Sequence, residues 1–89
     1  ERANAPADFP CTLAGRCCES GDLLAENTYV AKPKRGDLLA VLVTGAYNYS
    51  MASNYNRIPR PPVITLENGR ATVAVARESF ADLVRLDMD

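Results

Sequence analysis

Reactive side chains are concentrated in one stretch near the start of the chain, residues 15–22, with the sequence GRCCESGD. Thiol, carboxylate and hydroxyl groups stand there between and beside two glycines. Such side chains suit a buried strand poorly, because strand alternation would place them on both faces. Glycine permits tight turns and lets a backbone approach a ligand closely. The stretch is therefore typical of a loop that binds a ligand.

Cys18 and Glu19 carry the clearest chemistry in this loop. A thiol with a tuned pKa can give or take a proton near neutral pH, and a carboxylate can hold an ammonium group through a charge-assisted hydrogen bond. Both side chains reach one ligand only if the backbone turns, which the following Ser-Gly pair allows. The alternative is an ordinary loop with an incidental thiol. We interpret Cys11 and Cys17 as small buried hydrophobic residues.

Tyr47 is a second candidate, because it follows Gly45 and Ala46 at the end of an apolar run. A fixed phenol beside backbone amides that no bulky side chain covers can hold a phosphate. The alternative is a core tyrosine with its hydroxyl at the surface. Tyr49 and Tyr55 are interpreted first as packing residues.

The chain has 89 residues and a net charge of −1, with both signs scattered. It allows one small domain at most, and a domain of this size buries only about 60–65% of its unfolded surface. Neither a nucleic-acid-binding stripe nor a cationic membrane face is expected. The longest uncharged stretch, residues 38–56, is too polar for a membrane span. No signal peptide is expected either, because no apolar segment follows the first residues.

Three cysteines, two of them adjacent, indicate reduced thiols in a cytoplasmic protein rather than a disulfide framework. Adjacent cysteines rarely bridge one another, because the geometry is strained. The sequence has no histidine and no CxxC pair, so no metal site is expected.

The first half of the chain predicts strands. Residues 1–9 are polar and read as a loop or a cut end. Residues 10–17 and 22–30 suit strands, the second with a kink, and residues 31–37 form a charged turn with Pro and Gly. The strongest strand prediction is residues 38–43, an apolar run typical of a strand buried on both faces.

The second half predicts a helical turn within residues 50–54 and then a hairpin. Two runs rich in β-branched residues, 63–66 and 71–76, flank an Asn-Gly pair, the clearest hairpin signal in the chain. Residues 78–86 carry apolar side chains at helical spacing, with Ser79 as a cap. We expect this short helix to lie over the sheet.

The predicted fold class is mainly β: about five antiparallel strands with a short C-terminal helix, making a partial barrel or sandwich. Residues 10–89 form this β domain, and residues 1–9 precede it. So few strands hardly close a barrel with room for a core. We therefore hypothesise that further strands of the domain lie upstream.

Four motifs, GRCCESGDLLA, RGDLLAVLVTGAY, SMASNYN and RPP, together resemble the C-terminal part of the diaminopimelate decarboxylases. The resemblance extends from about Thr12 to Leu86, and ornithine and arginine decarboxylases share it less completely. It implies an alanine-racemase-like fold, in which an N-terminal (β/α)8 barrel binds pyridoxal 5'-phosphate and a β domain carries these motifs. It also implies a lyase of lysine biosynthesis that converts meso-2,6-diaminopimelate to L-lysine and CO2.

By the same resemblance, Cys18 is the thiol that protonates the substrate carbon after CO2 leaves. Glu19 binds the distal amino group of the substrate, and Tyr47 contacts both the cofactor phosphate and the substrate. Two subunits pair head to tail as a homodimer, and the loop of one enters the active site of the other. Cys17 adds a thiol where many relatives have another residue, so Cys18 is assigned by its position next to Glu19.

The family's catalysis needs a lysine that holds the cofactor covalently. Lys32 and Lys34 are the only lysines here, and they stand in the charged turn and match no such motif. The chain by itself is therefore expected to be inactive. Two alternatives stay open: the β domain of a related arginine, ornithine or carboxynorspermidine decarboxylase, or a non-catalytic module that pairs with itself.

Overall fold

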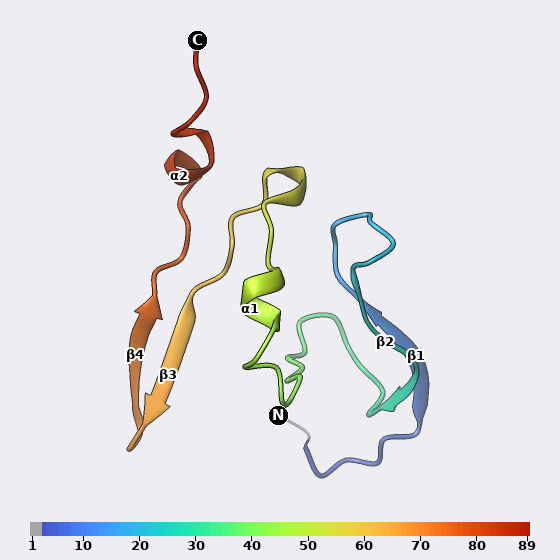
Figure 1. Cartoon of the computed structure of the whole chain (residues 1–89). Coiled ribbons are helices and arrows are strands. Elements are labelled where there is room, and N and C mark those ends of the chain that lie inside the picture. Colours follow the sequence, from blue (N-terminus) through green and yellow to red (C-terminus); the bar gives the residue numbers. More distant parts are fainter. Residues whose placement is uncertain (1–2) are drawn as a thin grey trace. The chain divides into compact units, whose positions relative to one another are not determined.

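The computed structural model describes residues 3–89 and divides into two compact units, one ending at Leu42 and the other beginning at Val43. Each unit contains one two-stranded antiparallel sheet (Figure 1). The fold is therefore mainly β, as predicted. Among the described residues there are four strands rather than about five, and they form two separate hairpins rather than one partial barrel.

The first unit is built on strands β1 (Phe9–Ala14) and β2 (Leu23–Val30), which pair from Phe9↔Val30 to Ala14↔Leu23. The register shifts twice near the loop end of β1, and Asn27 has a φ of 50°. An extra residue in one strand bends that strand, which explains the predicted kink in β2. Both predicted strands are confirmed, although β1 ends before the glycine at position 15.

Two predicted connections fall in this unit. A loop is expected at residues 1–9, of which the first two lie outside the described residues. Residues 3–8 contain no helix or strand, as predicted, and Phe9 is the first residue of β1. The charged turn is confirmed. The Asp37 amide donates to the Lys34 carbonyl at 3.1 Å, and the Lys34 amide donates to Asp37 Oδ2 at 2.7 Å.

The strand predicted at residues 38–43 is wrong for this chain, because these residues adopt no regular structure. An apolar run forms a strand only where a neighbouring strand satisfies its amides and carbonyls. Among residues 3–89, no strand pairs with this segment. Its large side chains remain exposed; Leu42, for example, is 79% accessible.

In the second unit, strands β3 (Val63–Glu67) and β4 (Arg70–Val75) form the predicted hairpin. Asn68 and Gly69 connect them with φ angles of 49° and 74°. Positive φ at both central residues is the geometry that favours Asn-Gly in two-residue hairpin loops. The local sequence thus determines this element.

Three short helices complete the second unit. Helix α1 (Asn48–Met51) begins two residues before the predicted turn, and the 3-10 helix η1 (Tyr55–Arg57) follows it. Helix α2 (Phe80–Val84) is a shorter form of the predicted terminal helix. Its cap is confirmed, because the Ser79 hydroxyl accepts from the Asp82 amide at 3.2 Å and the Asp82 carboxylate accepts from the Ser79 amide at 2.7 Å.

The prediction that this helix lies over a sheet is wrong. The Phe80 side chain is 77% exposed, and no side chain of α2 is buried. In Figure 1 the helix follows the end of β4 rather than covering the β3–β4 hairpin. A two-stranded hairpin offers too little apolar surface to hold a helix of this length.

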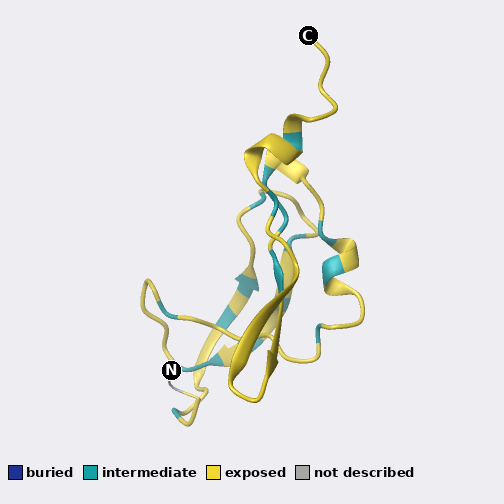
Figure 2. Ribbon diagram, turned by 90° about the vertical axis from the view of Figure 1, so that its left-hand side faces the viewer, coloured by how far each residue is buried: buried dark blue, intermediate teal, exposed yellow. Residues whose placement is uncertain are grey.

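Neither unit has a hydrophobic core among the described residues, and no side chain in residues 3–89 is fully buried (Figure 2). The half-buried positions are scattered along the β1–β2 hairpin and the connecting segments, whereas Val63 is the single half-buried residue of the β3–β4 hairpin. Both units therefore leave apolar surface uncovered.

Candidate functional site

The loop at residues 15–22 joins β1 to β2 (Figure 1). Its two ends are closed by a bond from the Gly15 amide to the Asp22 carbonyl at 2.9 Å. Within it, the Asp22 amide donates to the Glu19 carbonyl at 3.0 Å, which makes a tight turn over residues 19–22. The sequence-based prediction of a turn after Glu19 is confirmed.

This turn places Cys18 and Glu19 at the surface of the same loop, and both are exposed. Cys18 has a φ of 52°, a left-handed conformation that non-glycine residues adopt uncommonly. The Glu19 carboxylate accepts from the Gly21 amide at 2.8 Å and from the Ser20 hydroxyl at 3.4 Å. A carboxylate offers about four acceptor positions, so Glu19 can still bind a cation.

Cys17 differs from its neighbour. It is half-buried rather than buried, and its amide donates to Asp22 Oδ2 at 2.9 Å. The pKa of Cys17 is raised above its ordinary value. The largest cause is partial burial of the thiol, and hydrogen bonding to Asp22 and the negative charge of that carboxylate raise it further. These effects favour the protonated form of Cys17, while Cys18 is exposed to solvent. Cys11 is also half-buried, and none of the three cysteines forms a disulfide.

Tyr47 lies in the second unit, directly before α1, as its N-terminal flanking residue. Its carbonyl accepts from the Met51 amide at 3.0 Å and from the Ser50 hydroxyl at 2.8 Å. The side chain is 74% exposed, so it is no core tyrosine within this unit. Among the packing candidates, Tyr49 is half-buried and Tyr55 is exposed. Cys18 and Glu19 thus share one loop, and Tyr47 stands in a separate unit.

Sequence reasoning missed Asp22, which makes three hydrogen bonds in the reactive loop (residues 15–22). Its carbonyl accepts from Gly15 and closes the loop, its amide donates to Glu19 and forms the turn, and its carboxylate accepts from the Cys17 amide. The signal in the sequence was an aspartate placed directly after the Ser-Gly pair of the turn. Aspartate at the end of a Gly-containing turn frequently accepts a hydrogen bond from a nearby backbone amide.

Sequence reasoning also missed a polar cluster in the second unit. The Arg60 guanidinium pairs with Glu78, and the other carboxylate oxygen of Glu78 accepts from Asn54 Nδ2 at 2.9 Å. A second pair, Arg57 with Asp87 at 3.0 Å, lies nearer the end of the chain. These contacts join segments far apart in the sequence, so residue spacing alone does not reveal them.

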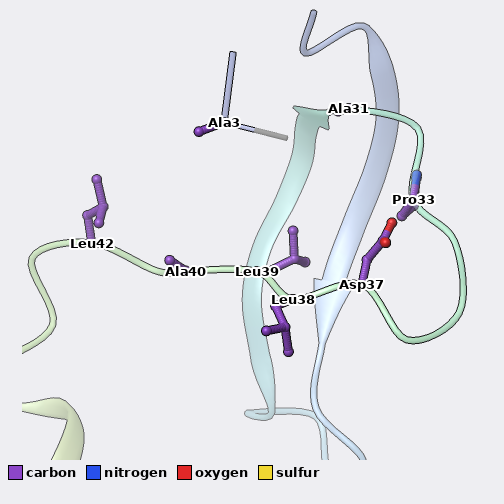
Figure 3. A pocket seen from close by; sticks show the side chains of 8 residues that line it. All are labelled: Ala3, Ala31, Pro33, Asp37, Leu38, Leu39, Ala40 and Leu42. Carbon is purple, nitrogen blue, oxygen red and sulfur yellow. The ribbon is translucent and has the colours of Figure 1, made fainter. Parts of the chain in front are cut away.

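A hollow of about 350 Å³ lies in the first unit, beside the irregular apolar segment (Figure 3). Its lining is Ala3, Ala31, Pro33, Asp37, Leu38, Leu39, Ala40 and Leu42. Figure 3 shows Leu38, Leu39, Ala40 and Leu42 along one stretch of backbone, while Ala3, Ala31 and Pro33 stand on other segments. The lining includes one carboxylate and none of the candidate site residues. We therefore interpret the hollow as a consequence of the uncovered apolar segment.

Among residues 3–89, no group of three metal-ligating side chains gathers in one place. No helix in the same range has the length and apolar character required to cross a membrane.

Comparison with known proteins identifies the class. Residues 1–45 match the family model described as pyridoxal-dependent decarboxylase, C-terminal sheet domain. The chain belongs to this family. The match includes the reactive loop and ends two residues before Tyr47.

Individual relatives cover more of the chain. It is 56% identical over 81 residues to the diaminopimelate decarboxylase of Bacillus subtilis, covering 91% of this chain and 18% of that protein. Identity is also 56%, over 77 residues, to the enzyme of the same name from Halalkalibacterium halodurans, covering 86% and 18%. The diaminopimelate decarboxylase of Synechocystis is 46% identical over 76 residues, which cover 85% of this chain and 16% of that protein. The chain thus spans less than a fifth of the length of these relatives.

Proposed function

We propose that these residues are part of the C-terminal sheet domain of a diaminopimelate decarboxylase. The complete enzyme is a pyridoxal-phosphate-dependent lyase that converts meso-2,6-diaminopimelate to L-lysine and CO2 in lysine biosynthesis. The names of the relatives support the substrate, and the family supports the cofactor.

The observation that carries the proposal is the different placement of the two adjacent thiols. Cys18 is exposed beside an exposed carboxylate, whereas Cys17 is half-buried against Asp22. Proton delivery requires a thiol that reaches the substrate, and recognition of a second amino group requires a carboxylate near it. In our proposal Cys18 protonates the carbon from which CO2 has left, and Glu19 holds the distal ammonium group.

The residues present fit the cofactor in part. The exposed phenol of Tyr47 is able to donate a hydrogen bond to a phosphate and to a substrate. When bound, pyridoxal phosphate acts as an electron sink for decarboxylation. Lys32 and Lys34 are both exposed, and neither has the desolvated surroundings of a covalent anchor. The isolated chain is therefore expected to be inactive, with the anchoring lysine supplied by the barrel domain of the complete enzyme.

We also propose that residues 38–43 become a strand in the complete enzyme. Their exposed apolar side chains, and the absence of a pairing strand among residues 3–89, support a neighbouring strand outside this chain, which would complete a partial barrel or sandwich over residues 10–89. The expected assembly is a cytoplasmic homodimer, in which the Cys18 loop of one subunit completes the site of the other.

The test is lysine release from meso-diaminopimelate by the complete enzyme with pyridoxal phosphate, with ornithine and arginine assayed in parallel. We expect lysine, a large loss of kcat in Cys18→Ala and a much smaller loss in Cys17→Ala, with cofactor retained in both. Equal losses in the two variants would contradict the assignment of Cys18.

The same assay separates the alternatives. Turnover of ornithine, arginine or a carboxylated polyamine without lysine formation would keep the chemistry and change the substrate. No turnover of any of them would favour the self-pairing module. For the shared site, mixing Cys18→Ala subunits with subunits that lack the anchoring lysine is expected to restore part of the activity.

A further inference from the structure

We propose that Asp22 is a positioning residue that holds the reactive loop so that Cys18, and not Cys17, is presented to the substrate. This inference rests on the proposed function and deepens it. It concerns a residue that binds neither substrate nor cofactor and acts through the backbone of its neighbours.

The first support is the set of bonds that Asp22 makes. Its carbonyl accepts from Gly15 at 2.9 Å, its amide donates to Glu19 at 3.0 Å, and its carboxylate accepts from the Cys17 amide at 2.9 Å. One residue thus closes the loop, forms the turn and anchors the residue immediately before Cys18. The backbone is consequently held on both sides of the Cys18–Glu19 pair.

The second support is the packing of the carboxylate against Gly15. A Cβ atom at Gly15 would collide with both carboxylate oxygens of Asp22. The missing side chain at this position is therefore what admits the carboxylate to the loop. Gly15 and Asp22 act together, since a side chain at position 15 would displace the Asp22 carboxylate.

The third support is electrostatic. The Asp22 carboxylate interacts with the amide and the thiol of Cys17, and its charge disfavours a thiolate there, in agreement with the raised pKa of Cys17. A thiolate is the nucleophilic form of cysteine, so this contact, together with partial burial, disfavours reaction at Cys17. Of the two neighbouring thiols, Asp22 disfavours the thiolate of one and orients the backbone of the other.

The chain contains a matched control for Asp22. Asp37 makes the same kind of bond in the other turn of the unit, where its carboxylate accepts from the Lys34 amide at 2.7 Å. Removing either carboxylate deletes a loop-stabilising bond to a backbone amide. Asp22 bonds to residues within the reactive loop, whereas the Asp37 bond lies in the turn at residues 34–37, so a general loss of loop stability would be seen in both variants.

The experiment is brief alkylation of the complete enzyme with iodoacetamide, in which a thiolate displaces iodide. Fragmentation of the tryptic peptide that begins at Cys17 then gives the ratio of label on Cys18 to label on Cys17. The wild type is expected to label mainly at Cys18. In Asp22→Ala the ratio should fall about three- to tenfold, the factor that corresponds to one net hydrogen bond. In Asp37→Ala it should stay as in the wild type.

An unchanged ratio in Asp22→Ala, or an equal fall in Asp37→Ala, would overturn the proposal. Because Asp22→Ala is at risk of not folding, Asp22→Asn is the second variant. Its amide oxygen can still accept from the Cys17 amide, but it carries no charge. It should keep kcat within a few-fold of the wild type, while Asp22→Ala loses kcat with cofactor retained. If Asp22→Asn were as impaired in kcat as Asp22→Ala, backbone positioning would be refuted.

Failure of this inference is distinguishable from failure of the proposed function. The labelling ratio depends on the loop alone and requires no turnover. If Cys18→Ala retained full activity while Asp22→Ala still changed the ratio, the loop geometry would stand and the role of Cys18 in proton delivery would be wrong.

Discussion

Arg60 and Glu78 are joined twice although eighteen positions separate them in the sequence: the guanidinium pairs with the carboxylate, and the Glu78 amide donates to the Arg60 carbonyl at 3.2 Å. The side chain of Glu78 is only 15% exposed. This double link ties the proline-rich segment before β3 to the segment that leads from β4 into α2. Both side chains of this ion pair are less exposed to solvent than those of the pair between Arg57 and Asp87.

The first prediction concerns the pH dependence of this link. The bond to Arg60, reinforced by Asn54, lowers the pKa of Glu78 below its ordinary value of 4.5. A carboxyl whose folded pKa is depressed contributes stability that is complete above the unfolded pKa and is lost as the pH falls through the folded pKa. Glu78→Gln should therefore lower the melting temperature of the complete enzyme at neutral pH. The difference from the wild type should shrink below about pH 4.5.

The control for this prediction is Asp87→Asn, which breaks the more exposed pair with Arg57. Surface pairs of this kind contribute little, so its melting temperature should stay near that of the wild type. A difference between Glu78→Gln and wild type that grows as the pH falls would have the wrong sign for the proposed link.

The second prediction concerns the β3–β4 hairpin. Gly69→Ala should destabilise by about 1–2 kcal/mol, because an L-residue with a Cβ is strained in the left-handed region that Gly69 occupies at φ 74°. Gly45→Ala is the matched control, because a Cβ at either position meets no atom within 4 Å and only Gly69 has a positive φ. Denaturant unfolding of the complete enzyme measures both. Equal effects would mean that the backbone conformation is not the cause.

The third prediction concerns substrate recognition by Glu19. Glu19→Gln should raise the KM for diaminopimelate about tenfold or more with a smaller change in kcat, because a neutral amide loses the charge-assisted bond to an ammonium group. Glu26→Gln removes an exposed carboxylate from β2 and serves as the control. Steady-state kinetics gives both constants, and an unchanged KM in Glu19→Gln would contradict its assigned role.

The fourth prediction concerns the isolated 89-residue chain. It should show no sharp thermal transition by circular dichroism, because no described residue is buried and each sheet has only two strands. A cooperative melt that does not depend on protein concentration would show that the chain folds by itself. That result would argue against a missing neighbouring strand for residues 38–43.

Elements governed by neighbouring residues could be predicted from the sequence. The β3–β4 hairpin follows from an Asn-Gly pair that tolerates positive φ, and the start of α2 follows from the Ser79 cap. The turn after Glu19 and the motifs of the decarboxylase family were also readable, because their signals are the types and order of adjacent residues.

Elements that depend on distant partners required the tertiary structure. Residues 38–43 have the composition of a buried strand, but a strand exists only where another strand pairs with it, and no partner is present among residues 3–89. The two adjacent thiols look alike in the sequence. What separates them is the Asp22 carboxylate, which the antiparallel pairing of β1 and β2 returns to the Cys17 amide at 2.9 Å.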